Sequence, residues 1–293
     1  GRNNHMCAIS SGEVKCWGTG SNGVIGVGNT TQQIFPVASN GMTSASWVTV
    51  GDSHTCAVNG GGAFCWGFGT SGQLGQGANS TSLTPVGVNG LASGVLSISA
   101  GGTHSCAVLS SGGVKCWGQG TAGQLGDGLN TLSNLPVTAI ASGVQSVVTG
   151  TNHSCALMAD ETVRCWGDDL YGQMGTSGGE TDRPTPTTVT GLSGVTKLVS
   201  GKNHTCALLN SGEVKCWGQN TYSQMSLAAG GISETPVIIS NLASGVSDLG
   251  AGADHTCAVV NGVSASTVKC WGRNNGNQIG GLDYPSFPNF VRP

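Results

Sequence analysis

Six histidines and twelve cysteines are the residues of this chain with the most evident chemistry, and they recur in a fixed order. Each histidine is followed two residues later by a cysteine, and a second cysteine comes shortly after the first. Imidazole and thiolate groups are zinc ligands, so the His-X-Cys spacing could serve a metal. The same cysteines could instead be joined in pairs as disulfides. The histidines are His5, His54, His104, His153, His204 and His255, and the cysteine pairs are Cys7 and Cys16, Cys56 and Cys65, Cys106 and Cys116, Cys155 and Cys165, Cys206 and Cys216, and Cys257 and Cys270.

These residues belong to a sequence repeat. Successive histidines are 49, 50, 49, 51 and 51 residues apart, and a tryptophan directly follows the second cysteine of every pair. A period of about 50 residues indicates a repeat architecture. No linker separates the copies, so we expect a single domain over residues 1–293. The signature segments lie at about 1–18, 51–67, 101–118, 150–167, 201–218 and 252–272.

Each repeat predicts four short strands, which we call A, B, C and D. In the fifth repeat, strand A is the apolar segment 195–201, which ends in glycine, strand B begins at His204, and strand C is 214–218. A Gly-rich loop follows, with Gly-Gln-Leu-Gly in its clearest copies, and a Pro-Val segment then opens strand D. Four antiparallel strands repeated in this way are typical of a propeller blade. We therefore predict an all-β protein, a β-propeller of six blades.

The predicted strands leave one blade a strand short at the point where the first and last blades meet, which we call the seam. The chain has six B–C hairpins but only five A strands, because Gly1 comes just after the first would end. The segment 287–291 aligns with strand D of the last blade. Glycines of the C–D loops are expected at positive φ, and Asn277 stands where one of them would be. We expect the fifth loop, with Ser223-Gln-Met-Ser226, to be the least regular.

The hairpin predicts the disulfide pairing. If Cys56 lies opposite Cys65, then Ala57 pairs with Phe64 and Val58 with Ala63, down to a tight turn at Gly60-Gly61. Cross-strand neighbours at non-hydrogen-bonded positions have the separation that a disulfide needs. Each bridge would close a short loop worth roughly 3 kcal/mol in the chain-entropy model. Pairing between neighbouring blades is the alternative.

Histidine and tryptophan both occur once per blade, which favours a structural role. A histidine required in every blade is interpreted as a ring bonded to a backbone carbonyl near a turn, and the alternative is a metal ligand. The repeated tryptophans are interpreted as wedges between neighbouring sheets, and the alternative is an aromatic ligand cage. Trp47 is outside the repeat and is expected to be exposed.

Composition narrows the function. Charged residues make up 9% of the chain and the net charge is −3, so no basic surface is available for nucleic acid. No apolar run approaches the ~20 residues of a membrane span, so we expect no membrane insertion.

Paired cysteines with none left over predict an oxidising compartment, hence a secreted or cell-surface protein. The start in mid-repeat, without a signal peptide, suggests a processed or excised form. No catalytic motif and no cofactor site are recognised, so we expect no enzyme and no cofactor.

The phrases Gly-X-X-His-Thr/Ser-Cys-Ala-Leu, Gly-X-Val-Lys-Cys-Trp-Gly and Gly-Gln-Leu-Gly resemble the repeats of the regulator of chromosome condensation family, a β-propeller family. The resemblance covers essentially the whole chain. The founding member's nucleotide exchange on a nuclear GTPase and its chromatin binding do not transfer, because this chain lacks a basic surface. Secreted, disulfide-bearing bacterial propellers with such repeats are closer in style. The resemblance implies binding through one face of the disc.

The residues that differ between repeats predict a binding surface. A–B turns and C–D loops must fall on one face of the disc, and mixed aromatic and charged residues there suit a partner. We expect a protein or surface glycan as the partner. The alternative is a structural subunit that assembles into a filament or coat with copies of itself, by strand addition at the seam. The candidates are Asp52, Phe68, Asp168, Asp169, Tyr171, Lys202, Tyr222, Asp254 and Arg273.

Overall fold

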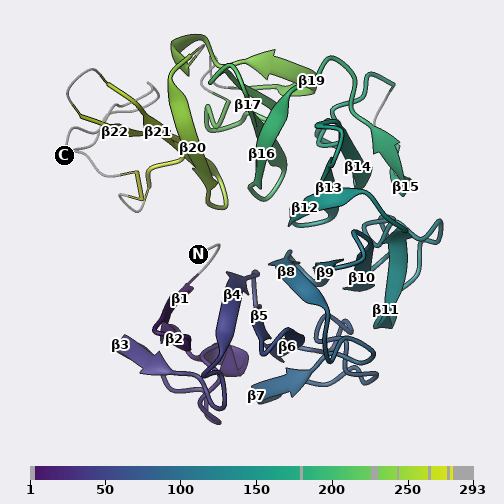
Figure 1. Cartoon of the computed structure of the whole chain (residues 1–293), viewed down its shortest axis with the longest axis vertical. Coiled ribbons are helices and arrows are strands. Elements are labelled where there is room, and N and C mark those ends of the chain that lie inside the picture. The colour runs from purple at the N-terminus through teal and green to yellow at the C-terminus, as the bar shows by residue number, and fades with distance from the viewer. Residues whose placement is uncertain are drawn as a thin grey trace.

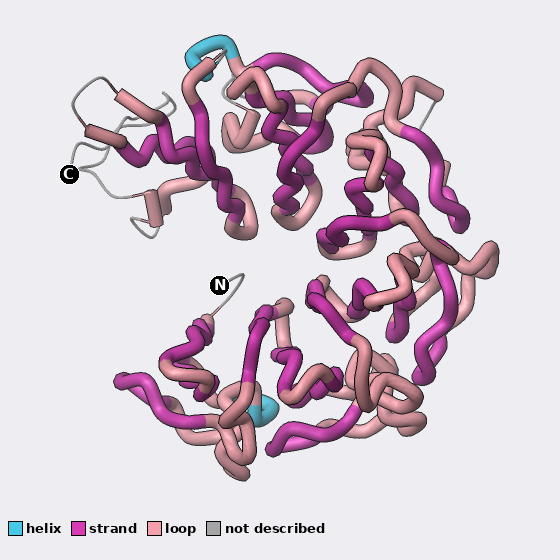
Figure 2. Tube along the Cα trace, viewed as in Figure 1, coloured by secondary structure: helices cyan, strands magenta, loops and turns pink. Residues whose placement is uncertain are grey.

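The computed structural model describes residues 4–178, 181–225, 230–242, 244–262, 265–275 and 278–279. Six small antiparallel sheets stand side by side around a common axis (Figure 1), and loops join them at both ends of the strands (Figure 2). Each repeat makes one sheet, so the prediction of a six-bladed β-propeller is confirmed. Blades 2 to 5 have four strands in the order A-B-C-D, whereas blades 1 and 6 have three within the described residues.

Strand A is the innermost strand of its sheet and lines the axis of the ring. Its hydrogen-bonding register with strand B shifts by a β-bulge near its start in every blade that has it. As the sequence predicted, blade 1 has no strand A within the described residues. The A strands are β4 (Ala45–Val50), β8 (Val95–Ala100), β12 (Val144–Thr149), β16 (Val195–Ser200) and β20 (Val246–Ala251).

Strands B and C form the hairpin that carries the disulfide. Cys56 lies opposite Cys65, and the register continues through Ala57 and Phe64 to the tight turn, as predicted. The Cα atoms of the paired cysteines are 4.0 to 4.1 Å apart. One disulfide therefore staples each blade, and bridges between blades do not occur. The hairpins are β1 (His5–Ser10) with β2 (Glu13–Gly18), β5 (His54–Asn59) with β6 (Gly62–Gly67), β9 (His104–Leu109) with β10 (Val114–Gly118), β13 (His153–Met158) with β14 (Val163–Gly167), β17 (His204–Leu209) with β18 (Val214–Gln219), and β21 (His255–Val260) with β22 (Thr267–Gly272).

Strand D is the outer edge of its blade. The predicted start at proline is wrong, because β7 begins at Ser82 and passes through Pro85. An outer edge strand tolerates proline, since the missing N–H need not face a neighbouring strand. The segment 287–291, predicted as the last strand D, lies outside the described residues. The D strands are β3 (Gln33–Ala38), β7, which ends at Gly87, β11 (Ser133–Ile140), β15 (Arg183–Thr188) and β19 (Ile232–Ile238), and two short 3₁₀ turns are η1 (Ser21–Gly23) and η2 (Ser240–Leu242).

The hydrophobic core lies between neighbouring sheets. Around the fourth blade, for example, Val163 and Trp217 belong to one buried cluster that extends from blade 3 to blade 5. Strand β4 packs on both β1 and β8, and the same succession of inner strands continues to β20. Among the described strands, Figure 1 shows a gap in the ring between blade 6 and blade 1. Each blade thus depends on its neighbours for burial, and the two end blades have one neighbour fewer within the described residues.

The C–D loops follow the predicted backbone. Gly72 and Gly75 of the second blade have φ values of 74° and 67°. Ser223 takes the corresponding position in blade 5 with φ of 60°, so the described part of that loop keeps the same turn despite its different sequence. Asn277 and Ser226 lie outside the described residues.

Candidate binding surface

Consecutive blades are joined by a hydrogen bond between a histidine of one blade and a hydroxyl of the next. We call each such contact between two blades a joint. Nε2 of His104 lies 2.9 Å from Oγ of Ser154, and both side chains are buried. The Ser154 hydroxyl donates to the main-chain carbonyl of Gln124 at 3.0 Å. Because a hydroxyl has one proton, its oxygen accepts from Nε2–H of His104, which fixes the tautomer of this imidazole. The five pairs are His5 with Thr55, His54 with Ser105, His104 with Ser154, His153 with Thr205, and His204 with Thr256.

A tryptophan of the second blade donates to the same loop carbonyl of the first. Nε1 of Trp166 lies 2.9 Å from the Gln124 oxygen, and the indole is fully buried. A Cβ at Gly126 would lie 2.7 Å from that nitrogen, so the last glycine of the Gly-Gln-Leu-Gly loop is required by the next blade's tryptophan. The predicted wedge is confirmed. The other pairs are Trp66 with Val24, Trp117 with Gln73, Trp217 with Gln173, and Trp271 with Gln224.

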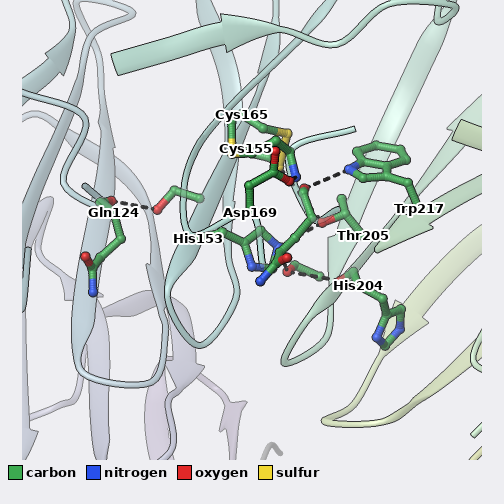
Figure 3. The surroundings of a disulfide bond; sticks show 12 residues. Gln124, His153, Cys155, Cys165, Asp169, His204, Thr205 and Trp217 are labelled. Carbon is green, nitrogen blue, oxygen red and sulfur yellow. Dashed lines mark hydrogen bonds between the residues drawn. A yellow bond between two sulfur atoms is a disulfide. The ribbon is translucent and has the colours of Figure 1, made fainter. Parts of the chain in front are cut away.

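The joints account for five of the six histidines, and the disulfides account for all twelve cysteines. Figure 3 shows the joint between blades 4 and 5, where His153 points toward Thr205 beside the Cys155–Cys165 disulfide. The sequence predicted a backbone carbonyl as the partner of the histidine ring, whereas the observed partner of Nε2 is a hydroxyl of the next blade. No cysteine is free, so no thiolate remains for zinc. Within the described ranges, no three His, Cys, Asp or Glu side chains are placed to hold a metal ion.

Two of the histidines have a lowered pKa. Burial lowers the pKa of His5 to about 4. Burial also lowers the pKa of His255. Desolvation disfavours the charged imidazolium, so burial favours the neutral form of both rings.

Asp169 is buried and holds its own loop together. Its Oδ1 accepts a hydrogen bond from the Met174 backbone N–H at 3.0 Å, and 2% of the residue is exposed. Burial raises the pKa of this carboxyl to about 6. Asn220 makes the same bond to Met225 in blade 5, so a neutral amide serves equally well there. The carboxylate of Asp169 does not contribute to the exposed surface.

The A–B turns and C–D loops share one face of the ring, as the strand order requires. The first residue of each loop donates its N–H to the A–B turn of the same blade, as Phe68 does to Ser53 at 2.8 Å and Asp168 to Asn152 at 2.9 Å. We call this the loop face. Asp52 and Lys202 lie in its turns, and their backbone N–H groups donate to the turns of the next blade, at Gly101 and Ala253. Phe68, Asp52 and Lys202 are half-buried.

Three predicted residues form one cluster on the loop face, at blades 5 and 6. The Arg273 guanidinium lies over the Tyr222 ring, 5.1 Å from its centroid. The same side chain donates to Asp254 at 3.2 Å. Tyr222 remains 42% exposed. An aromatic ring, a cation and a carboxylate are thus held together on the surface by contacts between two blades.

A second group lies on blade 4. The Asp168 carboxylate accepts from the Leu170 N–H at 2.9 Å, and the Tyr171 N–H donates to the Gln173 side chain at 2.6 Å. Tyr171 is half-buried, whereas Leu170 is 51% exposed. Leu170 was missed from the sequence, although an apolar side chain inside a Gly-rich loop is the signal that could have identified it. Burial raises the pKa of nearby Asp182, and the Asp168 charge adds to the effect.

A cavity of about 520 Å³ lies on the ring axis. Its walls are the A strands of blades 2 to 6 together with Cys7 of blade 1. Hydroxyl groups of neighbouring strands are bonded across this wall, as Ser99 Oγ is to Thr149 Oγ1 at 2.8 Å. The cavity wall therefore combines apolar side chains, including Trp47 and Leu198, with hydroxyls that are bonded within the protein.

None of the helices described is both long and apolar enough to span a bilayer.

The fold is that of a β-propeller with one disulfide in each blade. A family model described as the RCC1-like domain matches residues 3–289. The chain belongs to this family, as the sequence resemblance predicted.

Known proteins share part of this sequence or share its fold. The ultraviolet-B receptor UVR8 of Arabidopsis thaliana is 29% identical over 190 residues, a match that covers 64% of this chain and only 31% of the receptor. Human WBSCR16 superposes with a TM-score of 0.83 at 21% identity, covering 99% of this chain and 80% of that one. Prp20p of Saccharomyces cerevisiae, studied with its binding to Gsp1p and histones, superposes with a TM-score of 0.84 at 19% identity, covering 100% of this chain and 76% of that one.

Proposed function

We propose that this protein is an extracellular, non-enzymatic recognition module that binds a protein through its loop face. The observation that carries the proposal is the cluster of Tyr222, Arg273 and Asp254. Tyrosine and arginine are the side chains that most often dominate the energy of a protein interface. Here the ion pair and the cation–π contact hold them in place before a partner arrives, which lowers the entropy lost on binding.

The relatives support a binding role. Prp20p binds Gsp1p and histones, and UVR8 is a receptor. The partners of this chain need not be theirs, because a fold hosts many functions and the loops that differ between blades determine the contacts. The net charge of −3 argues against a polyanionic partner.

The disulfides support an extracellular site of action. All twelve cysteines are paired within their own hairpins. Disulfides persist in oxidising compartments and are rare where glutathione keeps thiols reduced. We infer that the protein works outside the cell or at its surface.

A capture experiment tests the proposal. The purified chain, immobilised with its disulfides intact, is exposed to the secreted and surface fractions of its native source. Tyr222→Ala and Tyr171→Ala should reduce capture of the main bound species about tenfold or more without changing the melting temperature. Ser93→Ala is the matched control, because Ser93 is exposed in the D–A link and remote from the loop face. Capture that every loop-face variant leaves unchanged would contradict the proposal.

The chemistry of the partner is tested in the same assay. Protease treatment of the captured fraction should abolish binding if the partner is a protein. Binding that survives protease and is lost on periodate treatment would assign a surface glycan instead.

Self-assembly into a filament or coat is the second candidate function. It rests on the strand that blade 1 lacks within the described residues, since an unpaired edge can recruit a strand from another chain. Sedimentation velocity and light scattering over a wide concentration range test this candidate. A strictly monomeric disc at all concentrations removes it.

A further inference from the structure

Six asparagines of the chain are followed directly by glycine, at positions 22, 40, 59, 89, 261 and 275. In such a pair the backbone nitrogen of the glycine can attack the side-chain carbonyl carbon of the asparagine, because glycine has no Cβ to crowd the approach. The attack needs a glycine N–H that is free to lose its proton and an asparagine amide that is free to turn toward it. Five of the pairs lie wholly within the described residues, whereas Gly276 of the sixth does not.

Two of these pairs lie in equivalent turns, which follow strand D in blades 1 and 2. In blade 1 the Met42 N–H donates to the Ser39 carbonyl at 3.3 Å, and Gly41 between them has φ of 74°. Glycine at positive φ in the third position is typical of a type II turn. Asn89 and Gly90 take the same places in blade 2, where φ of the glycine is 71°. Both residues of each pair are exposed.

The reacting groups of these two pairs are free. Within the described residues, no hydrogen bond engages the N–H of Gly41 or that of Gly90. The side-chain amides of Asn40 and Asn89 likewise make no hydrogen bond to any described residue. Each pair therefore presents an exposed nucleophile and an exposed amide that nothing in the fold restrains.

In the other three described pairs the fold engages the same groups. The Gly60 N–H donates to the Ser44 carbonyl at 3.0 Å, and the side-chain oxygen of Asn59 accepts from the Ser44 N–H at 2.8 Å. These pairs must break a hydrogen bond before the nitrogen can react. The glycine N–H groups of the remaining two pairs are also bonded, Gly23 to the Gly20 carbonyl at 2.9 Å and Gly262 to the Ala265 carbonyl at 3.2 Å.

We propose that Asn40 and Asn89 are sites of spontaneous conversion to aspartate and isoaspartate through a cyclic succinimide. The Gly41 nitrogen gives up its proton to water and forms a bond to Cγ of Asn40, the bond from Cγ to Nδ2 breaks, and ammonia leaves with a proton returned by water. Water then adds to either carbonyl carbon of the ring and opens it, which gives aspartate or isoaspartate. Asn89 reacts in the same way with Gly90. Water is the only co-reactant.

Isoaspartate changes the turn that carries it, because the main chain then runs through the former side chain and gains a carbon atom. In blade 1 the turn is tied to strand C at both ends. The Ser39 N–H donates to the Val14 carbonyl at 2.9 Å, and the Val14 N–H donates to the Met42 carbonyl at 3.0 Å. A longer turn cannot keep both bonds at their present geometry. These turns lie at the opposite end of the strands from the loop face, so the proposal does not rest on the function proposed above.

Ageing of the intact, folded chain tests the proposal. The protein is incubated at mildly alkaline pH in water enriched in heavy oxygen, and peptide mapping by mass spectrometry follows each Asn-Gly pair. Asn40 and Asn89 should gain one heavy oxygen and appear in both the aspartate and the isoaspartate form. They should convert about tenfold faster than Asn59, whose glycine must first lose a hydrogen bond of ordinary strength. Amide exchange at Val14 should become faster in the isoaspartate form.

Two controls separate the effect of the fold from that of the sequence. Asn40→Thr copies the turn of blade 4, where Thr190 precedes Gly191 and φ of that glycine is 74°. This variant should lose the modification in blade 1, keep the melting temperature and leave the rate at Asn89 unchanged. In the reduced, unfolded chain all the Asn-Gly pairs should convert at similar rates, because no hydrogen bond then holds any of them.

Three results would overturn the proposal. Equal rates at Asn40 and Asn59 in the folded chain would mean that the hydrogen bonds of the fold do not control the reaction. The same order of rates in the unfolded chain would assign the difference to the neighbouring sequence. Aspartate without isoaspartate would mean direct hydrolysis of the side chain, with no attack by the glycine nitrogen.

Discussion

The joint between blades 4 and 5 and the open side of blade 1 contain the same sequence phrase in different surroundings. At the joint, Thr205, Ala207 and Trp217 are completely buried against the preceding blade. On blade 1 the corresponding residues are Met6, which is 48% exposed, Ala8, which is exposed, and Trp17, which is half-buried. The hairpin register is the same in both places. The local phrase therefore specifies the hairpin, whereas burial comes from the neighbouring blade.

Blade 6 shows the complementary side of the same comparison. Val268 of β22 is 51% exposed, whereas its counterpart Val214 in blade 5 is completely buried by blade 6. The hydroxyl that should receive a histidine is also absent from blade 1, where Met6 replaces it. Blade 6 retains the histidine of a joint, His255, and blade 1 retains the tryptophan, Trp17, so the hydroxyl is the one joint side chain that is replaced.

The largest expected difference between the buried joint and the open side of blade 1 is in the stability cost of removing a tryptophan. Trp217→Ala should lower the free energy of unfolding by about 3–5 kcal/mol, since it empties a fully buried site and leaves the Gln173 carbonyl unpaired. Trp17→Ala should cost about 1 kcal/mol, because blade 1 has no preceding blade against the indole within the described residues. Urea unfolding with intact disulfides measures both. Equal costs would show that the side of blade 1 is covered in solution.

The joint hydroxyl gives the next contrast. Ser154→Ala removes the hydroxyl partner of His104 Nε2 and one of the two donors to the Gln124 carbonyl, and it should destabilise the protein by about 1–3 kcal/mol. Met6→Thr introduces a hydroxyl at the equivalent position of blade 1 and should change stability by less than about 0.5 kcal/mol. Thermal and urea unfolding compare the two variants. A large gain from Met6→Thr would indicate that a histidine reaches that position.

The rates of disulfide reduction should also differ between a blade inside the ring and an end blade. Cys155 and Cys165 are completely buried between two blades, whereas Cys257 and Cys270 of the last blade are both half-buried. Attack by a thiolate requires access to the sulfur, so the blade 6 bridge should be reduced about tenfold faster or more. Limited reduction, alkylation and mass mapping measure the two rates. Simultaneous loss of all bridges would mean that global unfolding, and not local exposure, controls access.

The smallest expected difference in stability is between Asp169 and Asn220, the equivalent residues of blades 4 and 5, and it depends on pH. Burial raises the pKa of Asp169 from 3.8 to about 6. Between these two pH values the carboxyl is protonated in the folded state and ionised in the unfolded state. The free energy of unfolding therefore falls as pH rises from about 4 to 6, and the loss is complete above that window. Asp169→Asn should stabilise the protein on the order of 1 kcal/mol at pH 7 and have little effect near pH 3.5.

The reciprocal variant is the control for this pair. Asn220→Asp should place a buried carboxylate in the same bond to Met225 and destabilise the protein at pH 7. Melting temperatures across the pH range compare all three proteins. A pH profile that neither substitution changes would exclude the carboxyl as its source.

The sequence by itself determined the hairpin and its disulfide. The symmetric spacing around Gly60-Gly61 allows one register between Cys56 and Cys65, and this depends only on residues within one turn of each other. The glycine conformations of the C–D loops were predictable for the same local reason. The five A strands after the first hairpin could also be located from the sequence, because each of them is followed by a glycine just before its histidine.

Only the tertiary structure decided where each blade's polar groups go. The hydroxyl of Ser154 meets a histidine 50 residues earlier, and no local rule connects the two positions. The same holds for Asp169, which looked like a surface carboxylate beside Asp168 but turns inward to the Met174 N–H. The cluster of Tyr222 and Arg273 likewise forms between two blades. Contacts of this kind depend on the angle between sheets, which the packing of whole blades sets and the local sequence does not.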